Sequence, residues 1–344
     1  MVKPSVLMLY NEPQLPKDHP DAYSEHSVVE IADAMIQALT QEGYHVERLG
    51  VGNDPTLLWR ELQQRKPDVV FNLFEGNLDN PETESYVAGL LDWAGIPYTG
   101  CPFATLGLAR AKHTTKYLLK GAGLPTAAFQ VVAELPMAEC TLAYPVIVKP
   151  AKQDASVGVD QASVCVNAQQ LEKRVEYILA TYGAPVLIEE YIDGRELNVA
   201  LVELPGLRSM PPSEILFPDK GQQEWAILTY EGKWKAGSLD FDPRPSRFPD
   251  DLSTAAIRKL GRLAMKAYRL LGCRDYARVD FRMNHAGKFF ILEVNPNPEI
   301  SEEAGFVGKQ GSAHFTHREF IVRLVEQAYS RKDAPKPTFV PIRP

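Results

Sequence analysis

Apolar and polar residues alternate with a period of two along two short segments near the C-terminus, Tyr276–Phe281 and Phe290–Asn295. This period predicts two half-buried β-strands, and the turn residues at 284–287 predict that the strands form a hairpin. We centre the turn between Ala286 and Gly287, which fixes the predicted pairing of the two strands. One face of the hairpin is then apolar and the other is polar.

The predicted polar face pairs Asp280 with Glu293 and Arg278 with Asn295. Two directly opposed carboxylates repel each other unless a cation lies between them. Carboxylate and amide oxygens without His or Cys suit a hard ion such as Mg²⁺, usually shared with substrate phosphates. Arg278 suits a phosphoryl group or an oxyanion. The alternative is a hairpin whose polar face is simply solvated. On the predicted apolar face, the facing pairs are Val279 with Val294 and Phe281 with Leu292.

Short β-rich runs alternate with helical patterns in the first third of the chain. The runs at 6–10, 45–49 and 69–73 predict strands, and the patterns at 28–42, 55–64 and 82–91 predict helices. This rhythm predicts an open α/β layer. A second block follows, with helices predicted at 111–120 and 168–182 and strands at 144–149 and 185–191. The stretch 205–249, rich in Pro, Gly, Trp and charge, is typical of a functional or mobile segment.

Composition narrows the class of protein. The chain has 344 residues, too many for one simple core, and the apolar content of an ordinary globular protein. Its net charge of −7 argues against nucleic acid as the main partner. The four cysteines are scattered without a CxxC pair, so we expect neither a cysteine metal site nor a disulfide framework. No apolar run is long enough to span a bilayer, and residues 1–10 resemble a core strand rather than a secretory signal, so we expect a cytoplasmic location.

Two stretches of the second block suit nucleotide binding. Lys149 ends an apolar strand and enters the small-residue loop 150–158, whose amides can face phosphate. Lys112 opens a helix and is a weaker phosphate candidate, because a lone lysine is usually solvated. The segment Val186–Glu196 runs from a buried-type strand into a polar hinge that suits an adenine edge and ribose hydroxyls. The alternatives are an ordinary Gly/Ser loop and an edge strand with solvated glutamates.

In this order, the stretches resemble the ATP-grasp superfamily, and most closely the D-alanine–D-alanine ligases. The resemblance extends over residues 5–330 and rests on the ordered set rather than on one motif. The matching stretches are Val70–Asn72 with Glu75-Gly76, Gly95–Gly100, Lys112 with Lys116, Val146–Pro150, Ser156–Gly158, Ile188–Glu196, Tyr230–Lys233, Ala277–Asp280 and Leu292–Asn295.

The resemblance implies a fold class that combines α/β and α+β parts in a three-part ATP-grasp architecture. The implied parts are an N-terminal α/β pre-ATP-grasp domain at 1–105, a central lid at 106–193, a C-terminal catalytic domain at 194–332 and a flexible tail at 333–344. The implied activity is that of an ATP- and Mg²⁺-dependent ligase, with two ions, that phosphorylates a carboxylate. An amine then attacks the acyl phosphate. Positioning and electrostatics supply most of the catalysis in phosphoryl transfer.

The resemblance also assigns roles to residues of this chain. Arg278 is expected to hold the acyl-phosphate oxygens, Lys233 to lie beside the γ-phosphate and Ser156 to lie in the loop over the phosphates. These three are the expected catalytic residues. The expected metal ligands are Asp280, Glu293 and Asn295. The expected ATP contacts are Lys112, Lys149, Ser156, Glu189, Glu190, Tyr191, Ile192, Glu196, Lys233 and Leu292.

The amino-acid site departs from the family. Ala155 replaces the first serine of the phosphate loop, and Trp234 replaces a tyrosine of the network that closes the site. The expected substrate contacts are Glu25, for the ammonium of the first substrate, and Arg278. Glu299 replaces a glycine, and Ala304-Gly305 replace the Ser-Leu pair that receives the second substrate's carboxylate. A carboxylate there would meet added negative charge, so Glu299 predicts an acceptor that is cationic, larger or without a nearby carboxylate.

Three functions stay open at this point. The first is a carboxylate–amine ligase acting on an amino acid or peptide as a small-molecule substrate, with an acceptor other than D-alanine. The second is a true D-alanine–D-alanine ligase, with the added glutamates pointing to solvent. The third is a non-catalytic nucleotide-binding module, which a loss of Arg278 or Asn295 would have favoured. We expect no nucleic-acid or membrane partner, and a homodimer is possible because dimers are common among the proteins this chain resembles.

Overall fold

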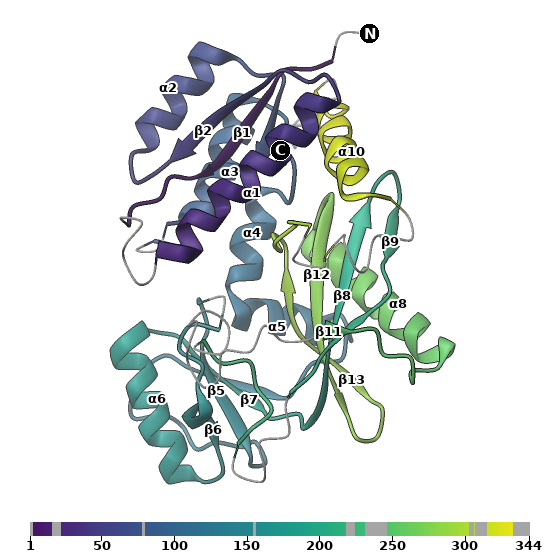
Figure 1. The fold of residues 1–344 in the computed structure, drawn as a ribbon. Coiled ribbons are helices and arrows are strands. Elements are labelled where there is room, and N and C mark those ends of the chain that lie inside the picture. Colours follow the sequence, from purple (N-terminus) through teal and green to yellow (C-terminus); the bar gives the residue numbers. More distant parts are fainter. Residues whose placement is uncertain are drawn as a thin grey trace, which may run out of the picture.

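The chain folds around three β-sheets that follow one another along the sequence (Figure 1). The computed structural model describes residues 3–15, 22–77, 80–153, 156–217, 224–230, 246–302, 306 and 315–332, with the backbone alone at 22–25 and 246. Several predicted features lie outside the described residues. They are Ala155, Lys233, Trp234, Ala304-Gly305, the tail 333–344 and the side chain of Glu25.

The N-terminal sheet has three parallel strands in the order β2-β1-β3, at the top of Figure 1. Its elements are β1 (Val6–Asn11), α1 (Ala22–Gln41), β2 (Val46–Val51), α2 (Pro55–Arg65), β3 (Val69–Asn72) and α3 (Thr83–Ala94). The first five residues of β1 are buried, as expected for a parallel strand covered on both faces. Asp54 caps α2 by accepting a hydrogen bond from the Thr56 amide, and Gly95 ends α3 in the left-handed conformation.

The central sheet is antiparallel in the order β4-β7-β5-β6. Its elements are β4 (Phe129–Val132), β5 (Val146–Pro150), β6 (Val164–Cys165), α6 (Ala168–Tyr182) and β7 (Val186–Glu190). Leu171, Val175 and Ile178 of α6 pack against the sheet and give it a core of its own. The short helices α4 (Phe103–Arg110) and α5 (Lys112–Gly121) connect this sheet to the N-terminal layer.

The C-terminal sheet has the order β11-β10-β8-β12-β13, with β9 beside β8. Its strands are β8 (Gly194–Glu203), β9 (Leu207–Ser209), β10 (Ser213–Ile215), β11 (Ser246–Arg247), β12 (Tyr276–Asn284) and β13 (Phe289–Asn295). Three of these short strands lie within 205–249, so the described part of that stretch is more regular than the sequence predicted. Disulfide bonds contribute nothing to this fold, because all four cysteines are free.

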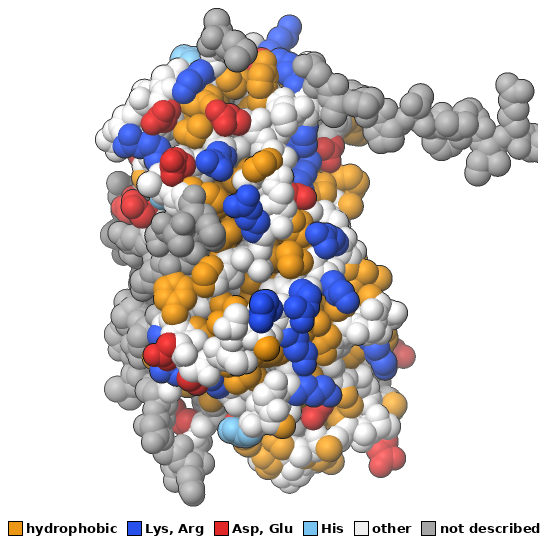
Figure 2. Space-filling model, turned by 90° about the vertical axis from the view of Figure 1, so that its right-hand side faces the viewer, with side chains coloured by type: hydrophobic (Ala, Val, Ile, Leu, Met, Phe, Trp, Pro, Cys, Tyr) orange, Lys and Arg blue, Asp and Glu red, His pale blue; other side chains and the backbone are white. Residues whose placement is uncertain are grey.

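Helix α8 (Thr254–Leu271) covers one face of the C-terminal sheet. Its buried residues recur at helical spacing, among them Leu260, Ala264 and Leu271. Its solvent side carries only basic charge, and Figure 2 shows lysine and arginine side chains gathered on the face of the molecule that carries α8. The basic residues of α8 are Arg258, Lys259, Arg262, Lys266 and Arg269.

The predicted hairpin forms from β12 and β13. Arg278 faces Asn295 and Asp280 faces Glu293, so the predicted register is confirmed at the polar end of the hairpin. The Asn284 amide donates a hydrogen bond that closes the turn, at the point where the two strands begin to pair.

Nearer the turn the predicted register is wrong, because a β-bulge follows Asp280. Phe281 faces Ile291 rather than Leu292. Ile291 is fully buried and fills the core, whereas Leu292 is half-buried. A bulge places two residues of one strand opposite one residue of its partner. The extra residue therefore leaves Leu292 beside Glu293 and outside the core.

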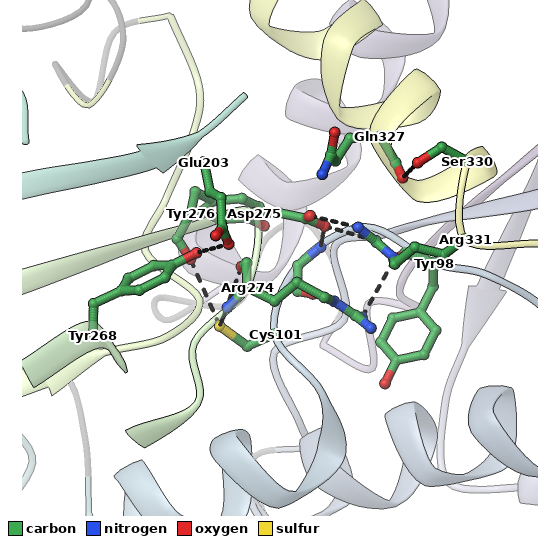
Figure 3. Close-up of polar contacts among 11 residues, drawn as sticks. Tyr98, Cys101, Glu203, Tyr268, Arg274, Asp275, Tyr276, Gln327, Ser330 and Arg331 are labelled. Carbon is green, nitrogen blue, oxygen red and sulfur yellow. Dashed lines mark hydrogen bonds and ion pairs between the residues drawn. The ribbon is translucent and has the colours of Figure 1, made fainter. Parts of the chain in front are cut away.

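The end of the described chain returns to the N-terminal layer. Helix α10 (His317–Tyr329) buries Phe320 and Leu324 in one core with α1 and β1. Beyond α10, Arg331 forms a two-pronged ion pair with the buried Asp275, at 2.7 and 2.9 Å (Figure 3). The amide of Gly100 donates to the same carboxylate at 2.9 Å. Asp275 thus joins the N-terminal layer, the C-terminal sheet and the end of α10.

Candidate active site

Three charged residues of β12 share the face of the C-terminal sheet that is turned away from α8. Arg278, Asp280 and Arg282 alternate with Val279 and Phe281, which are fully buried in the core under α8. Because successive side chains of a strand point to opposite faces, the three charged side chains lie together on the other face.

The strands on either side of β12 complete this face. Glu196 of β8 faces Arg282, and Asn198 of β8 faces Asp280. Glu293 and Asn295 of β13 face Asp280 and Arg278. We call the whole set the polar sheet face, which consists of Glu196, Asn198, Arg278, Asp280, Arg282, Glu293 and Asn295.

Arg278 and Asp280 form a two-pronged ion pair within β12. Arg278 Nε and Nη2 donate to the two oxygens of Asp280 at 2.8 and 2.9 Å. Burial alone would lower the pKa of Arg278, but the carboxylates of Asp280 and Glu293 outweigh it and raise this pKa above its ordinary value. Arg278 therefore keeps the positive charge that binding of anionic oxygens requires.

Helix α5 brings Lys112 to the hairpin. Lys112 Nζ lies 2.6 Å from Glu293 Oε2. The backbone amide of Lys112 donates to the carbonyl of Ala151 at 2.9 Å, which ties the start of the helix to the loop after β5. The structure thus joins a residue predicted to bind phosphate with a residue predicted to bind metal, and it places Ala151, at the start of the loop, beside Lys112.

The central sheet contributes a buried carboxylate between two lysines. Lys149 Nζ lies 3.1 Å from Glu189 Oε2, and Lys116 pairs with the other oxygen. Burial would raise the pKa of Glu189, but the two lysines overcome it and lower that pKa to about 2. Burial lowers the pKa of Lys116, and Glu189 opposes that effect. The sequence identified Lys116 only as part of a motif, and its complete burial was not foreseen.

The hinge segment after β7 separates exposed from buried residues. Glu190 is exposed, whereas Tyr191 and Ile192 are buried. The amides of Glu190 and Tyr191 already donate to protein carbonyls, at 2.8 and 3.1 Å. An adenine edge would therefore have to use other backbone groups of this segment. Ile192 packs against Phe290 of the hairpin, which joins the hinge to the C-terminal sheet.

Glu196 is buried on the polar sheet face. Burial raises the pKa of its carboxyl, Arg282 acts to lower it, and Asp280 acts to raise it. Lys149 of the central sheet also acts on this pKa, so charges of the two sheets influence each other. Sequence reasoning missed Arg282, although the alternation that identified Arg278 and Asp280 continues to it.

Ser156 lies in the loop after β5 with a positive φ of 64°. Such a conformation costs free energy for a residue other than glycine and is found more often at functional sites. Gly158 is required here, because a Cβ at this position would lie 2.7 Å from the Pro150 ring. Arg174 of α6 donates to the Gly158 carbonyl at 2.8 Å and so holds the end of the loop.

Glu299, the predicted acceptor residue, is exposed and accepts a hydrogen bond from Ser301 Oγ at 2.5 Å. Its charge acts on Glu75, a residue of the N-terminal layer for which no role was predicted. Solvent reaches the Glu75 side chain, yet protein crowds the carboxylate and raises its pKa to about 7. Glu84 and Glu299 add to the rise because like charges disfavour ionisation.

The polar sheet face fits a hard divalent cation. Asp280, Glu293 and Asn295 supply oxygen atoms on adjacent strands, the donor type that Mg²⁺ prefers. In the part of the chain that the structure describes, no group of three or more His, Cys, Asp or Glu side chains could hold a metal ion. A set of two carboxylates and one amide leaves coordination positions for oxygens of a bound phosphate. No helix of the described residues is long and apolar enough to cross a bilayer.

The chain is similar to proteins of one ligase family. Residues 118–326 match the family model described as "D-ala D-ala ligase C-terminus". The "Uncharacterized protein y4sG" of Sinorhizobium fredii is 32% identical over 308 residues, which cover 88% of each chain. A D-alanine–D-alanine ligase of Desulforudis audaxviator is 31% identical over 310 residues, covering 87% of this chain and 92% of that one. Among solved structures, the D-alanine–D-alanine ligase of Bacillus anthracis complexed with ATP has a TM-score of 0.71 at 17% identity, covering 96% of this chain and 98% of that one.

The fold and the matching family model define an ATP-grasp protein, as the sequence predicted, and the three-part α/β and α+β architecture is confirmed. The family model spans more than half of the chain, so this chain belongs to the D-alanine–D-alanine ligase family. Membership makes it an ATP-dependent ligase. The predicted boundaries between the three parts stay predictions.

Proposed function

We propose that this protein is an ATP- and Mg²⁺-dependent carboxylate–amine ligase whose amine acceptor is not D-alanine. A substrate carboxylate oxygen attacks the γ-phosphorus of ATP and ADP leaves, which produces an acyl phosphate. The amine then attacks the acyl carbon, phosphate leaves, the amine loses a proton and an amide bond forms. The observation that carries the proposal is the facing arrangement of Asp280 with Glu293 and Arg278 with Asn295 on one sheet face.

Each residue of the site has a role in this reaction. Arg278 is held by Asp280 with its charge intact, and it binds the oxygens of the acyl phosphate as negative charge develops there. Lys112 and Lys149 bind the phosphates of ATP. Ser156 presents its hydroxyl from the phosphate loop, and Lys233 lies beside the γ-phosphate. The nucleoside is bound by Glu189, Glu190, Tyr191, Ile192, Glu196 and Leu292.

Asp280, Glu293 and Asn295 would hold Mg²⁺, and we propose two ions. Bound Mg²⁺ would neutralise phosphate charge and orient the γ-phosphoryl group. The bulge at Leu292 bears on nucleotide binding, because it leaves the Leu292 side chain outside the core and next to Glu293. Leu292 then presents an apolar side chain where a base can pack.

The acceptor is proposed to be cationic, or to carry its carboxylate masked in a peptide or amide. Glu299 follows Asn295, the last residue of the hairpin, by only four positions, and its charge acts on Glu75. Glu84 and Glu299 both raise the pKa of Glu75, so a free amino-acid carboxylate beside Glu75 would meet added negative charge. Glu25 remains the proposed contact for the ammonium group of the first substrate.

Two rival functions are weaker. A true D-alanine–D-alanine ligase shares the proposed chemistry, but its second substrate would bring a carboxylate towards Glu299 and Glu75. A non-catalytic nucleotide-binding module would have no need of Arg278 and Asn295 in facing positions. A cytoplasmic location, a homodimeric state and the lack of a nucleic-acid partner stay predictions.

The test is a screen of amino acids, peptides and amines in pairs, with release of ADP and phosphate as the readout and mass spectrometry of the product. The proposal expects ADP release that requires both a carboxylate and a non-D-alanine amine. D-alanyl-D-alanine as the best product would replace the proposal with the first rival. Nucleotide binding with no turnover on any pair would favour the second.

A further inference from the structure

Arg282 is a buried arginine on the polar sheet face, only 4% exposed. It follows Asp280 by two positions on β12 and faces Glu196 across the β8–β12 pair. An arginine loses much hydration on burial and is seldom buried unless its donors are paired. The donors of Arg282 are therefore expected to have partners in the protein.

The guanidinium of Arg282 joins three parts of the chain. Its Nε lies 3.4 Å from Glu196 Oε2. Its Nη1 donates to the Gly194 carbonyl at 3.1 Å, and its Nη2 donates to the Ala226 carbonyl. Gly194 begins β8 directly after the hinge, and Ala226 belongs to the segment 224–230. The two carbonyls thus fix the plane of the guanidinium, and its Nε lies towards the Glu196 carboxylate.

Two aromatic rings enclose the same guanidinium. Its central carbon lies 5.8 Å from the centre of the Tyr191 ring and 5.2 Å from that of the Phe217 ring. Tyr191 also packs edge-to-face against Trp225 at 5.1 Å. Aromatic faces attract a guanidinium and restrict its plane. Arg282 is consequently held in one orientation by groups on the hinge, on β8 and on the segment 224–230.

We propose that Arg282 is a positioning residue that fixes the Glu196 carboxylate for recognition of the ribose hydroxyls of ATP. The inference rests on the proposed function, in which Glu196 accepts those hydroxyls. A carboxylate has about four acceptor sites on its two oxygens. Arg282 approaches one oxygen from the side of β12 and leaves acceptor sites for the sugar.

A merely structural Arg282 predicts a different result from a positioning one. If it only packed the hinge, its loss would lower stability and reduce kcat and affinity together, with no preference among sugars. If it fixes Glu196, its loss weakens the hydroxyl contacts, which raises KM for ATP and leaves kcat nearly unchanged. Loss of Arg282 also lowers the ratio of kcat/KM for ATP to kcat/KM for 2′,3′-dideoxyATP, which lacks both hydroxyls.

The experiment measures kcat and KM with ATP and with 2′,3′-dideoxyATP for the full chain, with acceptor and Mg²⁺ held at saturation. The variants are Arg282→Met, Arg282→Lys, Glu196→Gln and the double variant Arg282→Met with Glu196→Gln. The matched control is Arg269→Met, an exposed arginine of α8 on the other side of the sheet. Thermal unfolding of each variant accompanies the kinetics, and binding of ADP by calorimetry gives a readout independent of turnover.

We expect Arg282→Met to raise KM for ATP about tenfold, the effect of losing one charge-assisted hydrogen bond, with kcat within about twofold. KM for the dideoxy nucleotide should change little. In the Glu196→Gln background the same substitution should add almost nothing, because a residue that acts through Glu196 is silent once that carboxylate is lost. Arg282→Lys keeps the charge without the fork and should fall between wild type and Arg282→Met. If Arg282→Met does not fold, the same comparisons are made with Arg282→Lys.

Additive effects of the two substitutions, or equal losses with both nucleotides, would overturn the inference. Unchanged ADP affinity in Arg282→Lys and Arg282→Met would overturn it alone, with the proposed function intact. A wild-type protein that binds no adenine nucleotide would overturn the proposed function and the inference with it.

Discussion

Lys112 Nζ lies 2.6 Å from Glu293 Oε2, so one ion pair joins helix α5 to the hairpin of β12 and β13. The lysine side chain is mostly buried, whereas the carboxylate is 39% exposed. Glu293 therefore has solvent access on one side and a cation on the other. In the proposed enzyme the Glu293 carboxylate would also bind Mg²⁺, and Lys112 would bind a phosphate of ATP.

Glu293→Gln should retain the fold and lose turnover. A partly exposed ion pair contributes at most about 1 kcal/mol, so the free energy of unfolding should change by no more than that. ATP turnover should fall by at least about 100-fold, because the amide is a poorer ligand for a divalent cation. Thermal unfolding and ADP release over a Mg²⁺ titration check the two parts. Glu172→Gln on the exposed side of α6 is the control, and turnover near the wild-type rate in Glu293→Gln would rule out the metal assignment.

Glu189→Gln should destabilise the protein strongly. The substitution removes the partner of Lys116, which is buried, and breaking a buried ion pair costs about 3–5 kcal/mol. Glu190→Gln on the same strand is the matched control, since Glu190 is exposed. Urea unfolding at neutral pH should show the loss in the first variant and near wild-type stability in the second. Equal midpoints for the two would mean that the pair contributes little.

The Glu189 pair should also fail in acid. The pKa of Glu189 is about 2 in the folded protein, below its ordinary value, so the unfolded chain takes up the proton first as pH falls. The stabilising contribution is complete above a pH of about 4.5 and is lost as pH falls towards 2. The stability gap between wild type and Glu189→Gln should therefore shrink over that range. A gap that is constant from neutral pH to pH 2 would contradict the assignment.

Asp275→Asn should loosen the junction between the N-terminal layer and the C-terminal sheet. Asp275 has a positive φ of 63°, which asparagine also adopts with little strain, so the backbone should be retained. The change removes a buried charge facing Arg331 and weakens the acceptor of the Gly100 amide, which costs about 3 kcal/mol. The denaturant midpoint should fall accordingly. Asp250→Asn, at an exposed position before α8, should leave it unchanged.

The sequence predicted the polar end of the hairpin because strict alternation specifies which residues face each other there. It mispredicted the other end because Phe290–Leu292 is uniformly apolar, and such a run does not reveal a one-residue bulge. Arg282 escaped notice for a different reason. A charged residue near a turn is normally solvated, and its burial depends on Tyr191 and Ala226, which lie far away in sequence.

The acceptor should respond to Glu299 and Glu75. D-alanine as the second substrate should be poor in the wild-type protein, because its carboxylate would approach Glu299 and Glu75, where Glu299 already disfavours the charge of Glu75. Basic amino acids, diamines or amidated amino acids should give higher kcat/KM. Glu299→Gly should shift the preference towards free amino acids by about tenfold, the effect of removing one like charge at short range. Ser301→Ala, which removes the hydroxyl bonded to Glu299 and keeps the charge, is the control.

The pH dependence gives the same hypothesis a second test. The pKa of Glu75 is about 7, so its carboxylate gains charge as pH rises through neutrality. KM for a cationic acceptor should fall over that interval, and KM for an amidated neutral acceptor should not follow the same curve. Glu299→Gln removes one of the charges that raise the Glu75 pKa, so the transition should move to lower pH. If wild-type protein makes D-alanyl-D-alanine as its best product and Glu299→Gly changes nothing, the added carboxylates have no part in choosing the acceptor. The chain would then act as an ordinary D-alanine–D-alanine ligase.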